Sequence, residues 1–584
     1  MAGVPGSSAR VFPAPLSAVS AGGGCGFAPW LLIVAAVGAC GLLLSLPLNL
    51  PAGAFYWDLY VYVDGAHRVL RGQMPSVDFF APVGPISYWL FAASMKVFPG
   101  AQPLLGVNWC MLVVSAPAMA AVLIHVDRRS RPLAFGLCIP FLIFQLLPVN
   151  VEQFTFYLGF DSFGAYNRHT SGLLYVLVAM LLFVREQRLL AFGLAWLLIG
   201  LFLLKITGFV LGVGLCLYAL AAGRVSWRAA LGSAAIFLGA MTALDLATGV
   251  VSAYLTDILT LLRMNSDTLL SRIVRAGSLH AEAVVATFLL LLALGWQKRA
   301  APWRAGTAGS GRLLGRSGLF DGDLAWVAAV AGAALLFETQ NTGGHAFLLL
   351  WPVLLRVLAG SMARGREVLI PVLVAAIAAP PALALLGRTA RNIATHAQYQ
   401  RLDLPILKGL GRVTQRPDTL QNATVRQRVD AATLDAQTLY FESGGKDDVE
   451  TFASPKFQIL WLRAAAEAAE AVRRVERETG TVFRSVLNLG FVNPFPYILD
   501  RDAPRLVAIG ADPNRTTPRP DAATLASIAE TDLLLASHCP LTAMDRDVQR
   551  LYSPAIAGRV AMKLSPCWTA YPRSAPRLPF PGAP

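Results

Sequence analysis

Long apolar stretches separated by short polar ones fill the first two thirds of the chain. Most of these stretches approach the roughly 20 residues that an α-helix needs to cross a bilayer. They predict an α-helical polytopic membrane protein with about 11 spans. The predicted spans are residues 28–50, 104–125, 132–150, 170–184, 189–204, 206–222, 229–249, 281–296, 324–337, 345–358 and 368–387.

The pattern changes after residue 387, where the last third of the chain holds more than half of its charged residues. An amphipathic helix is expected at 456–480, and strand-like runs follow at 482–489, 505–509, 532–537 and 559–564. This alternation is typical of a small α/β domain with a largely parallel sheet. We therefore expect a disordered cytoplasmic N-terminus (1–27), a transmembrane domain (28–387) with a long first outer loop (51–103), and an extracytoplasmic soluble α/β domain (388–584).

Composition and charge agree with a membrane protein. The 584 residues are 55% hydrophobic and 14% charged, with a mean hydropathy of +0.55. Soluble domains carry roughly a quarter charged residues, which excludes a large soluble enzyme. The net charge of +14 does not indicate a nucleic-acid partner, because no basic block is interleaved with aromatic residues.

The basic residues indicate the orientation in the membrane. With the N-terminus in the cytoplasm, the inside loops hold twice as many Lys and Arg residues as the outside loops. The positive-inside rule selects this orientation and places the C-terminal domain outside. It requires that residues 86–98 do not cross, and 13 residues are too short to do so. We expect an amphipathic helix at the outer interface there, with Tyr88 and Trp89 at headgroup level.

The first outer loop carries acidic candidates for chemistry. A helix is predicted from Trp57 to Arg71, ended by Gly72. Asp58 follows Trp57 where a span leaves the bilayer, so its basicity can be tuned by partial desolvation. Asp58 equally suits a helix cap. Asp64 is expected to pair with Arg68 four residues later.

The order of residues in this loop resembles the first extracytoplasmic loop of GT-C glycosyltransferases, which include protein mannosyltransferases and the lipid A aminoarabinose transferase. The pattern is carried by Asp58, Tyr60, Gly72, Pro75, Asp78, Gly84, Pro85 and Tyr88. The resemblance implies a GT-C-like fold, a polyprenyl-phosphate sugar donor, and inversion of the anomeric centre at the outer face. Many members carry two adjacent acids at the first position, whereas this chain has Asp58 alone.

Further outer segments offer donor-phosphate or substrate-binding candidates. The second outer loop supplies Glu152 and Asp161 as acids and Arg168, which can bind phosphate or anchor the membrane boundary. Lys205 lies between two apolar runs, where it either serves function or extends its amine to the surface. Asp78, Tyr60 and Tyr88 complete the candidates from the first loop.

Glu338 and His345 lie in a short outer hairpin. They can line an acceptor or lipid-phosphate site, or satisfy exposed helix ends. His67 and His169 show no metal-ligand spacing, so a metal site would be carboxylate-based. The sequence leaves the cofactor undecided: the protein uses a divalent cation or it uses no cofactor.

We therefore expect a polyprenyl-phosphate-sugar-dependent inverting glycosyltransferase, with Asp58 as catalytic base. It would act at the outer face of the inner (plasma) membrane on a glycan, lipid or protein acceptor of the cell envelope, in contact with membrane lipids. The alternatives are a transporter or flippase of lipid-linked glycans, and a glycan polymerase or ligase. A transporter would show internal repeats and paired broken helices around midplane charges.

The soluble part contains two cysteines, Cys539 and Cys567. An oxidising outer compartment permits a disulfide between them, and two unpaired thiols are the alternative.

The orientation can be tested with a reporter fused after Pro584. We expect a reporter that works only outside the cytoplasm to be active there, because the charge alternation places this end outside. Activity of a reporter that works only in the cytoplasm would contradict the orientation.

Overall fold

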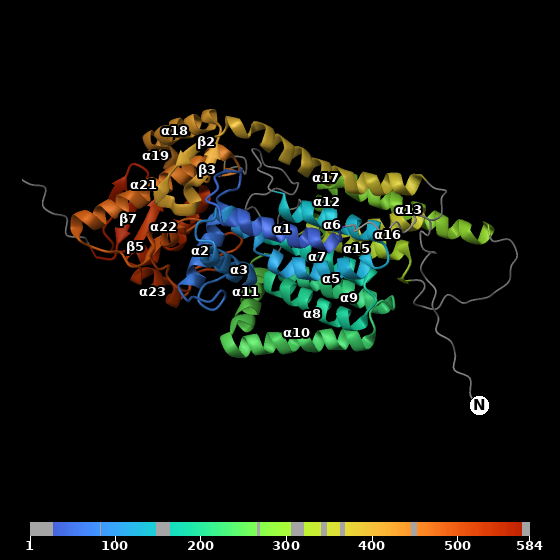
Figure 1. Cartoon of the computed structure of the whole chain (residues 1–584). Coiled ribbons are helices and arrows are strands. Elements are labelled where there is room, and N and C mark those ends of the chain that lie inside the picture. Colours follow the sequence, from blue (N-terminus) through green and yellow to red (C-terminus); the bar gives the residue numbers. More distant parts are fainter. Residues whose placement is uncertain are drawn as a thin grey trace, which may run out of the picture.

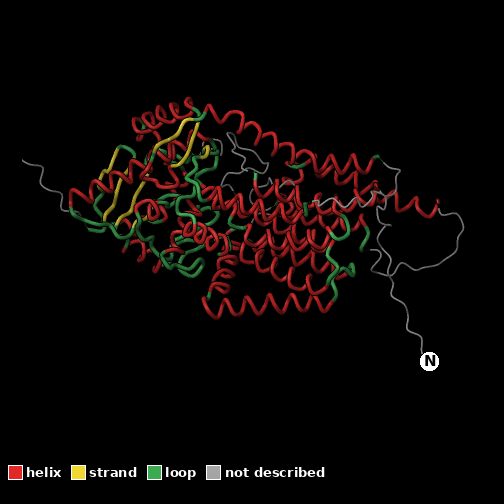
Figure 2. Tube along the Cα trace, viewed as in Figure 1, coloured by secondary structure: helices red, strands yellow, loops and turns green. Residues whose placement is uncertain are grey.

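The chain forms a bundle of helices with an α/β region at one end of it (Figure 1). The structure is a computed structural model. It describes residues 27–81, 83–147, 164–265, 269–304, 320–339, 347–362, 368–445 and 452–574, without the side chains of 298–304 and 362. The strands are gathered in the α/β region, and the bundle is helical (Figure 2).

Each predicted span overlaps at least one helix within the described residues. The helices are α1 (Pro29–Leu44), α4 (Pro103–Trp109), α5 (Leu112–Asp127), α6 (Arg131–Leu146), α7 (Ala165–Phe183), α8 (Gln187–Leu204), α9 (Ile206–Ala221), α10 (Trp227–Thr248), α13 (Ala281–Arg304), α15 (Asp323–Glu338), α16 (Trp351–Met362) and α17 (Leu369–Thr395). Four helical stretches within the described residues are long and apolar enough to cross a membrane, or five if a bent pair is one span. The chain is thus a multi-pass protein by its helices, and the number eleven stays a prediction.

Helix α7 forms the centre of the bundle. All of its residues from Asn167 to Phe183 are buried, and it contacts α5, α8, α9 and α16. Helices α10 and α17 lie at the periphery (Figure 1) and expose large apolar side chains, among them Leu246 and Leu383. Exposed apolar surface of this extent is stable where lipid covers it.

The first outer loop folds into two helices, α2 (Asp58–Leu70) and α3 (Ile86–Val97). As predicted, Gly72 follows α2, and its φ of +83° is accessible to glycine without strain. The expectation that Tyr88 lies at headgroup level is wrong. Tyr88 is 1% exposed and packs on Gly65 of α2, where an added Cβ would lie 2.4 Å from its ring.

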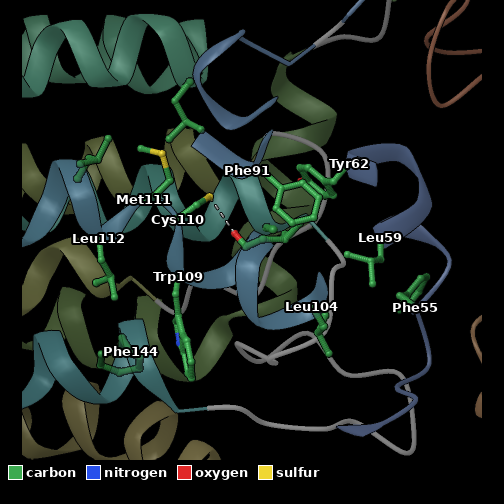
Figure 3. Close-up of a cluster of buried hydrophobic side chains, with 14 of the residues drawn as sticks. Phe55, Leu59, Tyr62, Phe91, Leu104, Trp109, Cys110, Met111, Leu112 and Phe144 are labelled. Atoms are coloured by element: carbon green, nitrogen blue, oxygen red, sulfur yellow. Dashed lines mark hydrogen bonds between the residues drawn. The ribbon is translucent and has the colours of Figure 1, made fainter. Parts of the chain in front are cut away.

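Apolar side chains join the first outer loop to the bundle. Figure 3 shows Leu59 and Tyr62 of α2, Phe91 of α3 and Leu104 of α4 in one buried cluster that continues to Leu112 of α5. Burial of a large apolar side chain contributes about 1.5–3 kcal/mol. The loop is therefore a packed part of the fold.

A three-stranded sheet joins the first outer loop to the C-terminal region. Its order is β1 (Leu50–Pro51), β3 (Arg412–Gln415) and β2 (Gln400–Asp403). Strand β1 pairs in parallel with β3, with Leu50 opposite Val413. The first outer loop and the C-terminal region therefore lie at the same end of the bundle.

A second sheet has the order β4 (Val486–Asn488), β5 (Leu533–Ser537), β7 (Trp568–Pro572) and β6 (Met562–Ser565). Only β4 and β5 are parallel, so the expected largely parallel sheet is wrong. The reason is the short connection between β6 and β7, since strands joined by a tight turn run antiparallel. The expected strand at 505–509 is also wrong, because Leu506 has a φ of +63°.

The helices of the C-terminal region are α18 (Pro417–Ala432), α19 (Leu434–Glu442), α21 (Pro455–Thr479), α22 (Phe495–Leu499), α23 (Ala522–Glu530), α24 (Ala543–Leu551) and α25 (Ser553–Ile556). Helix α21 matches the helix predicted at 456–480. Its apolar face is buried, and Gly480 ends it with a φ of +68°.

Cys539 and Cys567 form a disulfide in the structure, with their Cα atoms 4.9 Å apart. The bond ties the segment after β5 to the turn between β6 and β7. The two cysteines are 28 residues apart.

Replacing both cysteines by serine is expected to lower the free energy of unfolding by about 3 kcal/mol, because the open chain gains entropy when the loop is released. Chemical unfolding in detergent, compared with the free-cysteine variant Cys216→Ser, measures this difference. Full alkylation of Cys539 and Cys567 under non-reducing denaturation would show that the bond does not form.

Candidate functional site

Asp58 is the first residue of α2 and lies one position after the N-cap residue Trp57. Trp57 is fixed by its backbone amide, which donates to Gln458 Oε1 at 2.7 Å, and by its ring contacts with Phe457 and Phe491. Asp58 is therefore the first residue of a helix whose start is held against α21. A negative charge in this first turn is favoured by the helix dipole.

Tyr60 and Tyr62 lie on different faces of α2 and have different surroundings. Tyr60 is fully buried and stacks on Trp461 with ring centroids 4.5 Å apart, so it helps to join α2 to α21. Its hydroxyl has no hydrogen-bond partner among the described residues. A buried hydroxyl of this kind costs free energy until a partner binds it.

Lys205 lies at the break between α8 and α9, in a cluster from several helices. Its Nζ donates a hydrogen bond to Asn167 Oδ1 and lies 5.1 Å from the ring centroid of Tyr166. The ring of Phe337 is 5.4 Å away. The neighbouring acid, Glu338, interacts electrostatically with Lys205. Lys205 is half-buried, and its ammonium is held by aromatic rings and by the amide oxygen of Asn167.

A second pair extends this cluster. His280 lies between α12 (Leu269–Leu279) and α13, which are bent by 91°. Its Nε2 is 3.4 Å from Glu338 Oε2, and both side chains are at most 5% exposed. Glu338 therefore interacts with both cationic side chains of the cluster, with His280 directly and with Lys205 electrostatically.

The first outer loop reaches the Lys205 cluster through two tyrosines. The hydroxyl of Tyr62 accepts a hydrogen bond at 3.2 Å from the backbone amide of Tyr166. Tyr62 lies one helical turn after Asp58, with which it interacts electrostatically. The contact thus brings a carboxylate of the first loop and a cation of the bundle to the same end of α7.

Gly84 explains why the loop can lie on the α8–α9 break. Its amide donates to Leu204 O at 3.0 Å, and an added Cβ would lie 1.9 Å from Leu203 O. Only glycine allows this approach of two backbones. The Gly-Pro of the predicted motif therefore positions the loop directly beside Lys205.

Asp78 binds residues of its own loop and of the C-terminal region. Its Oδ2 accepts from the amide of Met74 at 2.7 Å, and its Oδ1 is 2.7 Å from Arg505. In the structure this candidate substrate ligand is thus engaged in contacts within the protein.

Asp64 and Arg68 form the expected pair at 2.9 Å, and both are buried. Burial raises the pKa of the Asp64 carboxyl above its ordinary value, and Arg68 opposes this shift. Arg68 also donates to Pro504 O at 2.6 Å, which ties α2 to the C-terminal region. His67 Nε2 donates to Arg501 O at 2.8 Å, and burial lowers its pKa.

Sequence reasoning missed several polar residues near this site: Tyr62, Tyr166, Asn167, His280 and Asp257. Asp257 lies on α11 (Val250–Met264), a helix that was not predicted. Its Oδ2 accepts from the amide of Ala81 at 3.2 Å, and burial raises its pKa to about 7. A single carboxylate in an apolar run of residues was a signal that could have identified it.

The remaining predicted residues are placed as follows. Arg168 is buried at the start of α7, beside His169, whose Nε2 donates to Asn108 O at 3.1 Å. Glu152, Asp161 and His345 lie outside the described residues, as does the N-terminal segment 1–26. No group of three His, Cys, Asp or Glu residues suited to a metal ion occurs in the described part of the chain.

Solved structures similar to the chain include two crystal structures of one protein. No protein-family model matches the chain, and no curated protein matches it. The crystal structure of ArnT from Cupriavidus metallidurans bound to undecaprenyl phosphate is 12% identical, with a TM-score of 0.45. The apo structure of the same protein is 11% identical, with a TM-score of 0.44. Each alignment covers 93% of this chain and 98% of the other.

The substitution Asp64→Asn is expected to lower the free energy of unfolding by about 3 kcal/mol, because it leaves the buried Arg68 charge uncompensated. Chemical unfolding in detergent measures the loss. Asp500→Asn is the matched control, since Asp500 is 69% exposed in its ion pair with Arg71. The double variant with Arg68→Met should recover part of the loss. Equal stability of Asp64→Asn and Asp500→Asn would contradict this role.

Proposed function

We propose that the protein is a polyprenyl-phosphate-sugar-dependent inverting glycosyltransferase that acts at the outer face of the inner membrane on a cell-envelope acceptor. The observation that carries the proposal is the convergence of Asp58 and Lys205 through the Tyr62–Tyr166 contact. A transfer of this kind needs a base for the acceptor and a cation for the departing phosphate. The two groups come from segments that are far apart in the sequence.

Lys205 is the proposed ligand of the donor phosphate. It lies where two apolar helices meet, beside the loop that joins the bundle to the C-terminal region. In this proposal the lipid chain of the donor lies among the helices and its phosphate lies at the break between α8 and α9. The phosphate would take the place of Asn167 as the partner of the ammonium, and the new ion pair would be charge-assisted.

Asp58 is the proposed general base. The acceptor hydroxyl gives its proton to the Asp58 carboxylate while its oxygen forms a bond to the anomeric carbon of the sugar. The bond from that carbon to the phosphate oxygen breaks, and its electron pair leaves with polyprenyl phosphate. A single displacement from the face opposite the leaving group inverts the anomeric centre.

Asp58→Asn is expected to lower the rate of transfer by a factor of about 10²–10⁴, because asparagine keeps the shape of the side chain and cannot accept the proton. The variant is expressed in a strain that lacks the wild-type protein, and lipid-linked sugar is measured by mass spectrometry. We expect the sugar donor to accumulate with Asp58→Asn and to be consumed with the wild-type protein.

Asp500→Asn is the control, because Asp500 is an exposed acid of the same region. It should consume the donor as the wild-type protein does. Lys205→Gln should raise the KM for the donor, since the phosphate loses its cation. Normal donor consumption by a folded Asp58→Asn protein would refute the proposed role of Asp58.

A further inference from the structure

We propose that Tyr254 and Asp257 of α11 are positioning residues that hold Lys205 in place for the donor phosphate; the inference rests on the proposed glycosyltransferase function. Lys205 lies outside the two helices that it separates, with φ and ψ angles of −158° and 119°. A residue in such a break has a fixed place only where neighbouring segments bind the backbone on both sides of it.

The two helix ends beside Lys205 are bound by different segments. The carbonyl of Leu204 ends α8 and accepts from the amide of Gly84 at 3.0 Å. The amide of Ile206 begins α9 and donates to the hydroxyl oxygen of Tyr254 at 3.2 Å. Helix ends leave such groups without partners inside the helix. The first outer loop therefore holds Lys205 on one side, and α11 holds it on the other.

Asp257 joins these two segments to each other. Its Oδ2 accepts from the amide of Ala81 at 3.2 Å, and Ala81 precedes Gly84 by three residues. Asp257 follows Tyr254 by three residues, so both lie on one face of α11. Their side chains are buried, at 8% and 1% exposed. The three hydrogen bonds thus close a ring around the backbone of Lys205.

The contact between Asp257 and the loop depends on pH. Burial raises the pKa of the Asp257 carboxyl to about 7, and the amide of Ala81 and Ser76 oppose this shift. When the loop leaves α11, the carboxyl meets water and its pKa returns toward the ordinary value of 3.8. The joined state therefore binds the proton more tightly. The contact is strongest below pH 3.8, weakens as the pH rises to about 7, and changes no further above it.

The other titratable or charged groups on the elements around Asp257 are Tyr254 and Arg263 on α11, Tyr88 on α3, Asp78 on the first outer loop, Lys205 at the break and Asp245 on α10. Asp78 pairs with Arg505, and Asp245 accepts from the amide of Ser252. Burial raises the pKa of both tyrosines above its ordinary value, so neither titrates near pH 7. The pH dependence of the contact is therefore assigned to Asp257.

The test is binding of undecaprenyl phosphate to the purified full-length protein in detergent, measured by calorimetric titration between pH 5 and pH 8. Asp257→Asn is the comparison, because its amide oxygen accepts from Ala81 and does not titrate. The probe itself titrates, so the result is the ratio of wild-type to Asp257→Asn affinity at each pH. We expect this ratio to fall between pH 5 and pH 7, by at most about ten-fold for each pH unit, and to stay level above. A constant or rising ratio would overturn the inference.

Tyr254→Phe tests the other contact of the ring. It should weaken binding about five-fold, as expected for one lost hydrogen bond, because the amide of Ile206 loses its partner. Tyr218→Phe is the matched control, since the hydroxyl of Tyr218 donates to Phe320 O at 2.6 Å near the opposite end of α9. It should bind as the wild-type protein does. Equal affinities of the two variants would also overturn the role of α11.

Lys205→Gln and Asp58→Asn separate this inference from the proposed function. Lys205→Gln should weaken binding of the probe, whereas Asp58→Asn should leave it unchanged. Binding that does not depend on Lys205 refutes both the proposed phosphate site and the role of α11. Binding that depends on Lys205, with a constant ratio for Asp257→Asn, refutes the role of α11 alone. An active Asp58→Asn protein refutes only the proposed base.

Discussion

The structure depends on hydrogen bonds to the backbone groups of a long buried loop. Residues 51–81 run between the bundle and the C-terminal region, and buried amide and carbonyl groups need hydrogen-bond partners. The C-terminal region supplies them. Strand β3 pairs with β1, the amide of Leu506 donates to Asp78 O, and the amide of Ile509 donates to Phe80 O. Arg68 adds a charged contact to Pro504 O. Because these bonds fix the loop on both sides, Asp58 has a defined place.

The sequence predicted those parts of the fold that are set by local patterns. Hydrophobic stretches located the helices of the bundle, and Gly72 and Gly480 marked the ends of α2 and α21, because glycine adopts positive φ without strain. The four-residue spacing of Asp64 and Arg68 predicted their pair correctly. Each of these features is determined within one or two helical turns of the chain.

The features that the sequence did not predict depend on contacts between distant segments. Tyr88 suits a membrane interface by composition, but the bare backbone of Gly65 provides a buried place for its ring. The predicted direction of the sheet was wrong because β7, which forms an antiparallel hairpin with β6, was not recognised as a strand. At the site, Lys205 could be named from its apolar surroundings, whereas Asn167 and Tyr166 became its neighbours only through the packing of α7 against α9.

The pairing of β1 with β3 has a consequence for biosynthesis. Leu50 emerges from the ribosome long before Val413, and the hydroxyl of Tyr56 likewise waits for the carbonyl of Leu410, 354 residues later. Contacts of such high sequence separation form late, because a long loop must close first. Residues 51–103 are thus synthesised well before the strand and the carbonyl group that they contact in the folded protein. Assembly of the acidic segment around Asp58 is therefore a late event in the maturation of the protein.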